Sequence, residues 1–134
     1  MSITALRDPK GLVAAVVSEP SGTALRRLFR EVISGWPHPF RHEECYTVGA
    51  FDDLEQQIGS EKAFRLVPEA AQIALEQTEA KLRETALTLL SGLVRCSNTT
   101  EVPLGLAELF PALKARCGNS SYYLEIEQWY RLTA

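Results

Sequence analysis

Cysteine is scarce in this sequence and is not arranged for cross-linking. The chain has three cysteines, Cys45, Cys96 and Cys117, which are far apart and form no CxxC pair. An odd number at such distances argues against both a disulfide framework and a zinc ribbon. We therefore expect a protein of the reducing cytoplasm.

Long apolar runs and a basic charge excess are also lacking. The longest purely apolar stretch, residues 12–17, is much shorter than the roughly 20 residues of a membrane-spanning helix. It is followed by Ser18-Glu19-Pro20, which does not fit a secretion signal. The net charge of −3 argues against nucleic-acid binding. With 134 residues of ordinary globular composition, the sequence predicts a single domain over 1–134 that spans no membrane.

Catalytic motifs are missing as well, since the chain has neither a glycine-rich phosphate loop nor a G-x-S-x-G elbow. The residue types that bind zinc do gather in one segment, at His38, His42, Glu43, Glu44 and Cys45. However, Pro39 separates the two histidines, and Cys45 falls on an apolar stripe with Val48. We therefore expect no metal, no cofactor and no enzymatic activity.

Helical periodicity, in contrast, is present along most of the chain. Apolar residues recur at helical spacing, and no segment shows convincing β-type alternation. The expected helices cover residues 12–18, 23–35, 42–58, 68–77, 78–95, the segment from Pro103 to Cys117, and about 120–131. The sequence thus predicts an all-α fold.

Several residues mark expected helix ends. Ser21 and either Asn119 or Ser120 are predicted N-caps, and Gly59 is a predicted stop. Pro68 is expected near the start of its helix, where proline is favoured. Gly118 is expected to end a helix in the left-handed conformation.

The helices pair with a regular recurrence. Pairs are predicted to begin near residues 22, 64 and 105, an interval of 41 to 42 residues that matches HEAT and armadillo repeats. The expected architecture is therefore a HEAT-like stack of antiparallel helix pairs, with residues 12–18 capping the first pair. An irregular helical bundle is the alternative, because it predicts the same apolar stripes.

Charge is segregated along the first third of the chain. Residues 42–61 hold six acids and no Lys or Arg: Glu43, Glu44, Asp52, Asp53, Glu55 and Glu61. One interpretation is a solvated face partly neutralised by arginines of the preceding helix, with little effect on stability. The other is a docking face for a basic protein, since complementary charge accelerates association.

Aromatic residues gather in the last predicted helix, at Tyr122, Tyr123, Trp129 and Tyr130. Tyr and Trp are common anchors at protein interfaces, so Tyr122, Tyr123 and Trp129 are candidate contacts for a partner. The alternative is that this helix buries its aromatic face against Leu106, Leu109 and Phe110.

Two stretches resemble small bacterial HEAT-like proteins. The segment Trp36-Pro-His-Pro-Phe-Arg-His-Glu-Glu-Cys resembles the start of the second helix in some of them. Residues 89–103, with the closing Tyr130-Arg-Leu, are also similar to this group, some members of which act as immunity proteins in toxin systems. The resemblance covers about half the chain. It implies a bacterial inhibitor that binds and blocks a toxin, and it assigns no catalytic residue to this sequence. The alternative is a non-catalytic structural or regulatory scaffold subunit, and the oligomeric state is left open.

Overall fold

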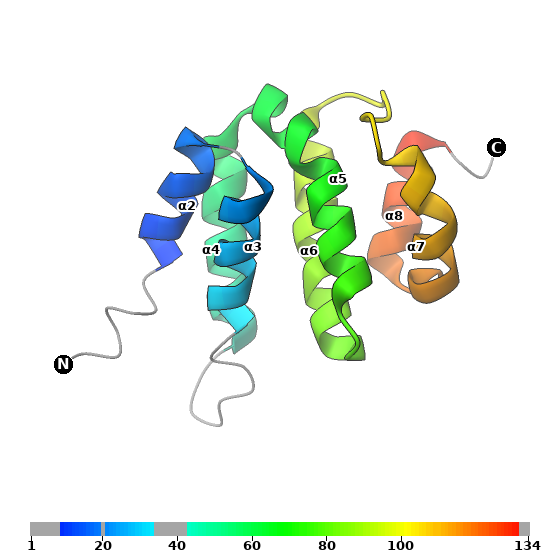
Figure 1. Ribbon diagram of the computed structural model, residues 1–134, viewed down its shortest axis with the longest axis horizontal. Coiled ribbons are helices and arrows are strands. Elements are labelled where there is room, and N and C mark those ends of the chain that lie inside the picture. Colours follow the sequence, from blue (N-terminus) through cyan, green and yellow to red (C-terminus); the bar gives the residue numbers. More distant parts are fainter. Residues whose placement is uncertain (1–8, 20, 34–42, 132–134) are drawn as a thin grey trace.

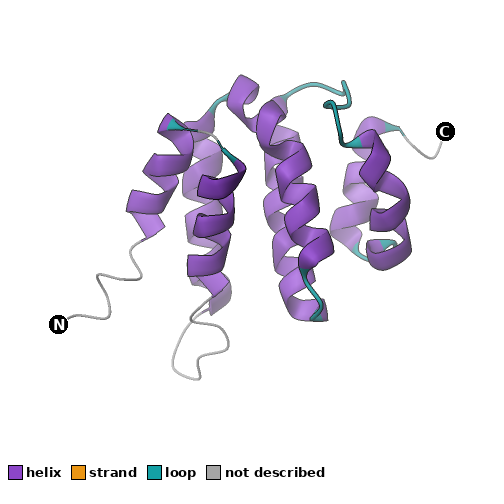
Figure 2. Ribbon diagram, viewed as in Figure 1, coloured by secondary structure: helices purple, strands orange, loops and turns teal. Residues whose placement is uncertain are grey.

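The computed structural model describes residues 9–19, 21–33 and 43–131, and the side chains from Gly11 to Ile33, except Pro20, and from Ala50 to Arg131. This part of the chain is all-α, and no strand occurs in it (Figure 2). The helices are α2 (Pro9–Ser18), α3 (Gly22–Ile33), α4 (Glu43–Ile58), α5 (Ser60–Glu76), α6 (Ala80–Ser97), the short 3₁₀ helix η1 (Ala107–Leu109), α7 (Phe110–Cys117) and α8 (Ser121–Tyr130).

The helices contact one another in two rows. Helices α3, α5 and α7 contact each other in that order, and α4, α6 and α8 do the same. Members of the two rows also meet as the consecutive pairs α3/α4, α5/α6 and α7/α8. Figure 1 shows α5 and α6 between the N-terminal and C-terminal helices. As expected, the first described helix, α2, packs against the α3/α4 pair.

The predicted apolar stripes form the core. Leu25, Leu28, Phe29 and Val32 of α3 are buried, as are Phe51, Leu54 and Ile58 of α4. In α6 the stripe from Ala86 to Val94 is buried, and it places Leu90 out of contact with water. Cys45 and Val48, which the sequence places on the apolar stripe of α4, lie outside the described side chains.

Most of the expected helix ends are confirmed. The Oγ of Ser21 accepts a hydrogen bond from the backbone N–H of Ala24, and that of Ser120 accepts one from Tyr122. Both serines therefore satisfy N–H groups that the helix cannot pair internally. Gly59, with φ of 79°, separates α4 from α5, and Asn98, with φ of 55°, ends α6.

The start of α5 was predicted wrongly. The helix begins at Ser60 and includes Pro68 within it, although a proline in a helix interior costs about 3 kcal/mol. Ala63, Leu66 and Val67 precede the proline, and all three are buried, so their packing offsets that cost. Figure 1 shows α5 changing direction along its first half.

The conformation of Gly118 was also predicted wrongly. Its φ is −59°, so α7 does not end in a left-handed residue. Glycine is required there because a Cβ would lie 2.5 Å from the backbone oxygen of Lys114. The helix pairs, moreover, begin at Gly22, Ser60 and Ala107, so the interval is unequal rather than the 41 to 42 residues expected.

Candidate functional site

The predicted acidic helix is α4, and its acids differ in exposure. Asp52 is exposed and Asp53 is half-buried. The side chain of Glu55 is only 24% exposed and is directed toward α6. Glu43 and Glu44 belong to the first turn of α4, but their side chains lie outside the described ones. Glu61 is exposed at the start of α5, where it pairs with Arg65.

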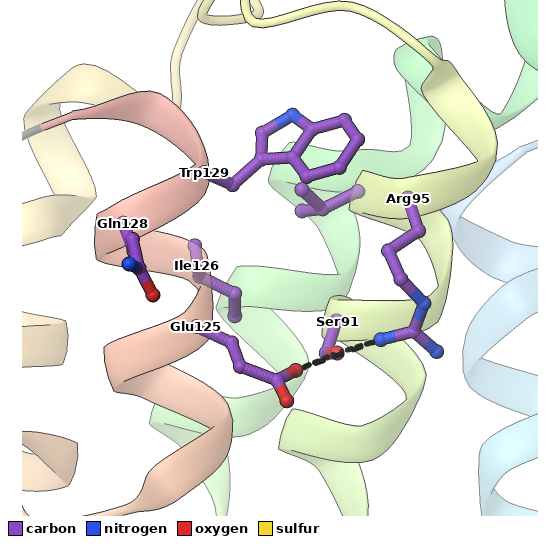
Figure 3. Close-up of a pocket in the computed structure, with 7 residues that line it drawn as sticks. Ser91, Arg95, Glu125, Ile126, Gln128 and Trp129 are labelled. Atoms are coloured by element: carbon purple, nitrogen blue, oxygen red, sulfur yellow. Dashed lines mark hydrogen bonds and ion pairs between the residues drawn. The ribbon is translucent and has the colours of Figure 1, made fainter.

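Arg95 connects three helices of one row. Its guanidinium lies 3.8 Å from a carboxylate oxygen of Glu55 on α4 and 3.6 Å from one of Glu125 on α8. It also donates a hydrogen bond of 2.7 Å to the Oγ of Ser91, which in turn donates to Glu125 at 3.4 Å (Figure 3). The chain of contacts therefore crosses α4, α6 and α8.

Gly92 provides the space that Glu55 occupies. A Cβ at this position would lie 2.1 Å from Oε2 of Glu55. Burial is the main cause of a raised pKa for the Glu55 carboxyl, which Arg95 lowers and Asp52 raises further. The carboxylate is thus only partly compensated by its ion pair, because desolvation disfavours its charged form.

A cleft of about 320 Å³ lies between α6 and α8, beside this chain of contacts. Its apolar lining consists of Val94, Ile126 and Trp129. Polar side chains line it as well, from Ser91 and Arg95 on α6 and from Glu125 and Gln128 on α8. In Figure 3 Trp129 and Glu125 extend from α8 toward α6, which carries Ser91 and Arg95.

The four aromatic residues of α8, three of which are candidate contacts, divide into two groups. Tyr123 is 1% exposed and Tyr130 is 7% exposed, so both belong to the core, and Tyr130 packs against Phe110. Tyr123 is therefore not available at the surface as a partner contact. Tyr122 and Trp129 are half-buried. The indole Nε1 of Trp129 donates a 2.8 Å hydrogen bond to the backbone oxygen of Thr99, which fixes the ring at the cleft.

A second cavity, of about 430 Å³, is lined by residues of α6, α7 and the start of α8. Both arginines that line it already donate hydrogen bonds to the backbone. Arg83 donates to the backbone oxygens of Gln77 and Thr78, and Arg116 donates to that of Leu75. These arginines thus satisfy carbonyl groups at the end of α5 and beyond it, which is a structural role.

The cysteines whose side chains are described show no sign of activation. Burial raises the pKa of the thiols of both Cys96 and Cys117, which disfavours the reactive thiolate. The side chains of the segment in which zinc-binding residue types gather, His38, His42, Glu43, Glu44 and Cys45, lie outside the described ones. Within the described part, no group of three potential metal ligands occurs.

Sequence reasoning found part of this site. It identified Asp52, Glu55 and Trp129: Glu55 pairs with Arg95, Trp129 lines the same cleft as Arg95, and Asp52 lies on α4 near Glu55. It missed Ser91, Arg95, Glu125 and Gln128. The available signals were the polar Ser91 inside the leucine stripe of α6 and the spacing of four between Glu125 and Trp129, which places them on one face of a helix.

None of the helices in the described ranges is long and apolar enough to cross a membrane. No protein-family model, curated protein or solved structure matches the chain.

Proposed function

We propose that this protein is a non-catalytic binding module whose protein partner docks on the face formed by α4, α6 and α8. The observation that carries the proposal is the cleft between α6 and α8 together with the charges beside it. The carboxylates of Glu55 and Glu125 both lie within ion-pair distance of the Arg95 guanidinium, and Asp52 is close enough to Glu55 to raise its pKa. A half-buried tryptophan beside a polar rim is typical of a protein interface.

A HEAT-like stack is the architecture that we propose for this module. The two rows of contacts, α3 with α5 with α7 and α4 with α6 with α8, support it. In such a stack each row of helices forms one continuous surface, which suits the binding of an extended protein. The unequal spacing of the pairs is compatible with a stack whose loops differ in length.

The specific role that we propose is neutralisation of a toxin in the bacterial cytoplasm. The resemblance of residues 89–103 to small bacterial HEAT-like proteins, some of which are immunity proteins, supports this role, and so does the excess of carboxylates beside the cleft. A toxin that acts on nucleic acid carries a basic surface, and an acidic face accelerates association with it. An inhibitor of this kind acts by covering the toxin and needs no catalytic group.

Charge reversal with a matched control tests the proposal. Asp52→Lys/Glu125→Lys alters the proposed face, whereas Glu79→Lys/Glu108→Lys alters exposed acids elsewhere. Both double variants change the net charge equally. Glu55 is left intact because it is largely buried against Gly92, so its reversal would disturb packing.

The three proteins are used as bait in lysate of the source organism, and captured chains are quantified by mass spectrometry at low and high salt. We expect a basic chain, captured stoichiometrically by the wild type and the control, to be lost from the Asp52→Lys/Glu125→Lys bait and at high salt. Equal capture by all three baits contradicts the proposed face. Recovery of bait alone as a concentration-independent dimer favours a scaffold subunit instead.

A further inference from the structure

The cleft between α6 and α8 has the shape and lining that suit one long side chain. Val94 and Ile126 are buried, and they form an apolar floor. The carboxylate of Glu125 and the amide of Gln128 lie on the α8 side. An aliphatic stem with a polar head fits such a lining, since the stem covers apolar surface while the head stays near polar groups.

The charges around the cleft favour a cation. Arg95 is shared between Glu55 and Glu125, at separations of 3.8 and 3.6 Å. Both separations exceed the roughly 2.7–2.9 Å of a tight charge-assisted hydrogen bond. The side chain of Glu125 is also 62% exposed, so its oxygens retain capacity to accept further hydrogen bonds.

Trp129 supplies the third element of recognition. Its ring lines the cleft, and the hydrogen bond from Nε1 to the backbone of Thr99 holds it in place. Cations are attracted to the face of an indole ring, and a planar guanidinium also stacks on it. In Figure 3 Trp129 and Glu125 extend from the same helix toward the cleft.

We propose that this cleft receives an arginine side chain of the docked protein, with its guanidinium between the Trp129 ring and the Glu125 carboxylate. Arginine is favoured over lysine because its planar, forked donors match a carboxylate and stack on an aromatic ring. Arg95 then keeps its contact with Glu55. This inference names the anchor of the partner and therefore rests on the proposed binding function.

The test uses small peptides and so does not require the partner. The full chain has two tryptophans, and Trp36→Phe leaves Trp129 as the sole indole. Acetyl-Gly-Arg-Gly-amide is titrated into this variant while the indole ¹H–¹⁵N resonance is recorded. The matched probe carries citrulline, which has nearly the shape of arginine without its charge, and a lysine peptide is the third probe.

We expect the arginine peptide to shift the Trp129 resonance saturably, and the citrulline peptide to bind about tenfold more weakly. Glu125→Gln, added to the same background, should weaken arginine binding by a similar factor, whereas Glu108→Gln should not change it. Equal binding of arginine and citrulline peptides, or no loss in Glu125→Gln, overturns the inference.

The two proposals fail in different ways. If capture of a partner depends on Asp52 and Glu125 but the arginine peptide does not bind, only the arginine site is wrong. If the peptide binds but capture is the same for all baits, the arginine site stands and the proposed docking function is wrong. Thermal melts of Glu125→Gln and Glu108→Gln establish that both variants are folded.

Discussion

At the scale of single residues, Glu55 is a carboxylate that the fold partly removes from water. Its pKa is raised above 4.5, chiefly by burial, so the unfolded chain releases this proton at a lower pH than the folded protein. As the pH rises through 4.5 toward the raised value, the folded state binds more protons than the unfolded state does. The free energy of unfolding therefore falls over this pH range. Glu55→Gln has no such proton.

We therefore expect the stability of Glu55→Gln, relative to the wild type, to increase as the pH rises through this window and to stay constant above it. Urea unfolding between about pH 4 and pH 7 measures the difference, with Glu108→Gln as the control for loss of one charge. A relative stability that is independent of pH contradicts the desolvation of Glu55.

Two buried tyrosines of α8 provide a matched pair. The Tyr130 hydroxyl has no hydrogen-bond partner among the described residues, whereas that of Tyr123 interacts with the buried carboxyl of Glu127, which helps to raise the tyrosine pKa. Burial is the main cause that raises both pKa values to about 12. Removing the two hydroxyl groups should therefore have unequal effects on the free energy of unfolding.

We expect Tyr123→Phe to lose about 1 to 3 kcal/mol, because the buried carboxyl of Glu127 loses the polar group that it interacts with. Tyr130→Phe should change stability by less than about 0.5 kcal/mol or increase it, since no hydrogen bond is lost. Chemical denaturation of both variants under the same conditions measures the contrast. A larger loss in Tyr130→Phe would show that its hydroxyl has a partner in the native state.

At the scale of helices, Gly92 sets how α4 packs on α6. Alanine favours a helix by about 0.8–1.0 kcal/mol over glycine, yet its Cβ would lie 2.1 Å from Oε2 of Glu55. The carboxylate would have to turn away and lose its contact with Arg95. The effect of Gly92→Ala should therefore depend on residue 55.

A double-mutant cycle tests this dependence. We expect Gly92→Ala to stabilise the Glu55→Ala protein by up to about 1 kcal/mol and to give at least about 0.5 kcal/mol less in the wild type. Urea unfolding of the four proteins gives the coupling energy. Additive effects would contradict the close approach of Glu55 to α6.

The same scale shows what periodicity predicts and where it stops. The stripes of α3 and α6, the Ser21 and Ser120 caps and the stop at Gly59 follow from local chemistry, and all are present. Pro68 misled the prediction because the packing of Leu66 and Val67 with other helices outweighs a local rule. Tertiary contacts of that kind are not encoded in spacing.

The site was less predictable for a related reason. Glu55, Arg95 and Glu125 come from α4, α6 and α8, and only the packing of these helices brings them together. Likewise, Tyr123 and Trp129 are equally aromatic, and their helix spacing alone does not tell which one faces the core. The sequence thus predicted the candidate types, and the packing decided which of them share a surface.

At the scale of the whole molecule, α6 holds the fold together. It packs against α5 and also contacts α4 and α8. A change in its core residues therefore affects packing toward both ends of the described chain. Leu90 is fully buried at its centre, whereas Leu104, in the loop that follows α6, is 97% exposed. The two leucines allow the same substitution to be compared in opposite environments.

We expect Leu90→Ala to lower the free energy of unfolding by about 2 to 5 kcal/mol, and Leu104→Ala to change it by less than about 0.5 kcal/mol. Circular dichroism follows all helices, and Trp129 fluorescence in the Trp36→Phe background follows α8. Both transitions should shift together in Leu90→Ala, because the helices share one core around α6. Separate transitions would mean instead that α8 unfolds independently of the α2–α5 helices, and the proposed docking face would then lack a rigid support.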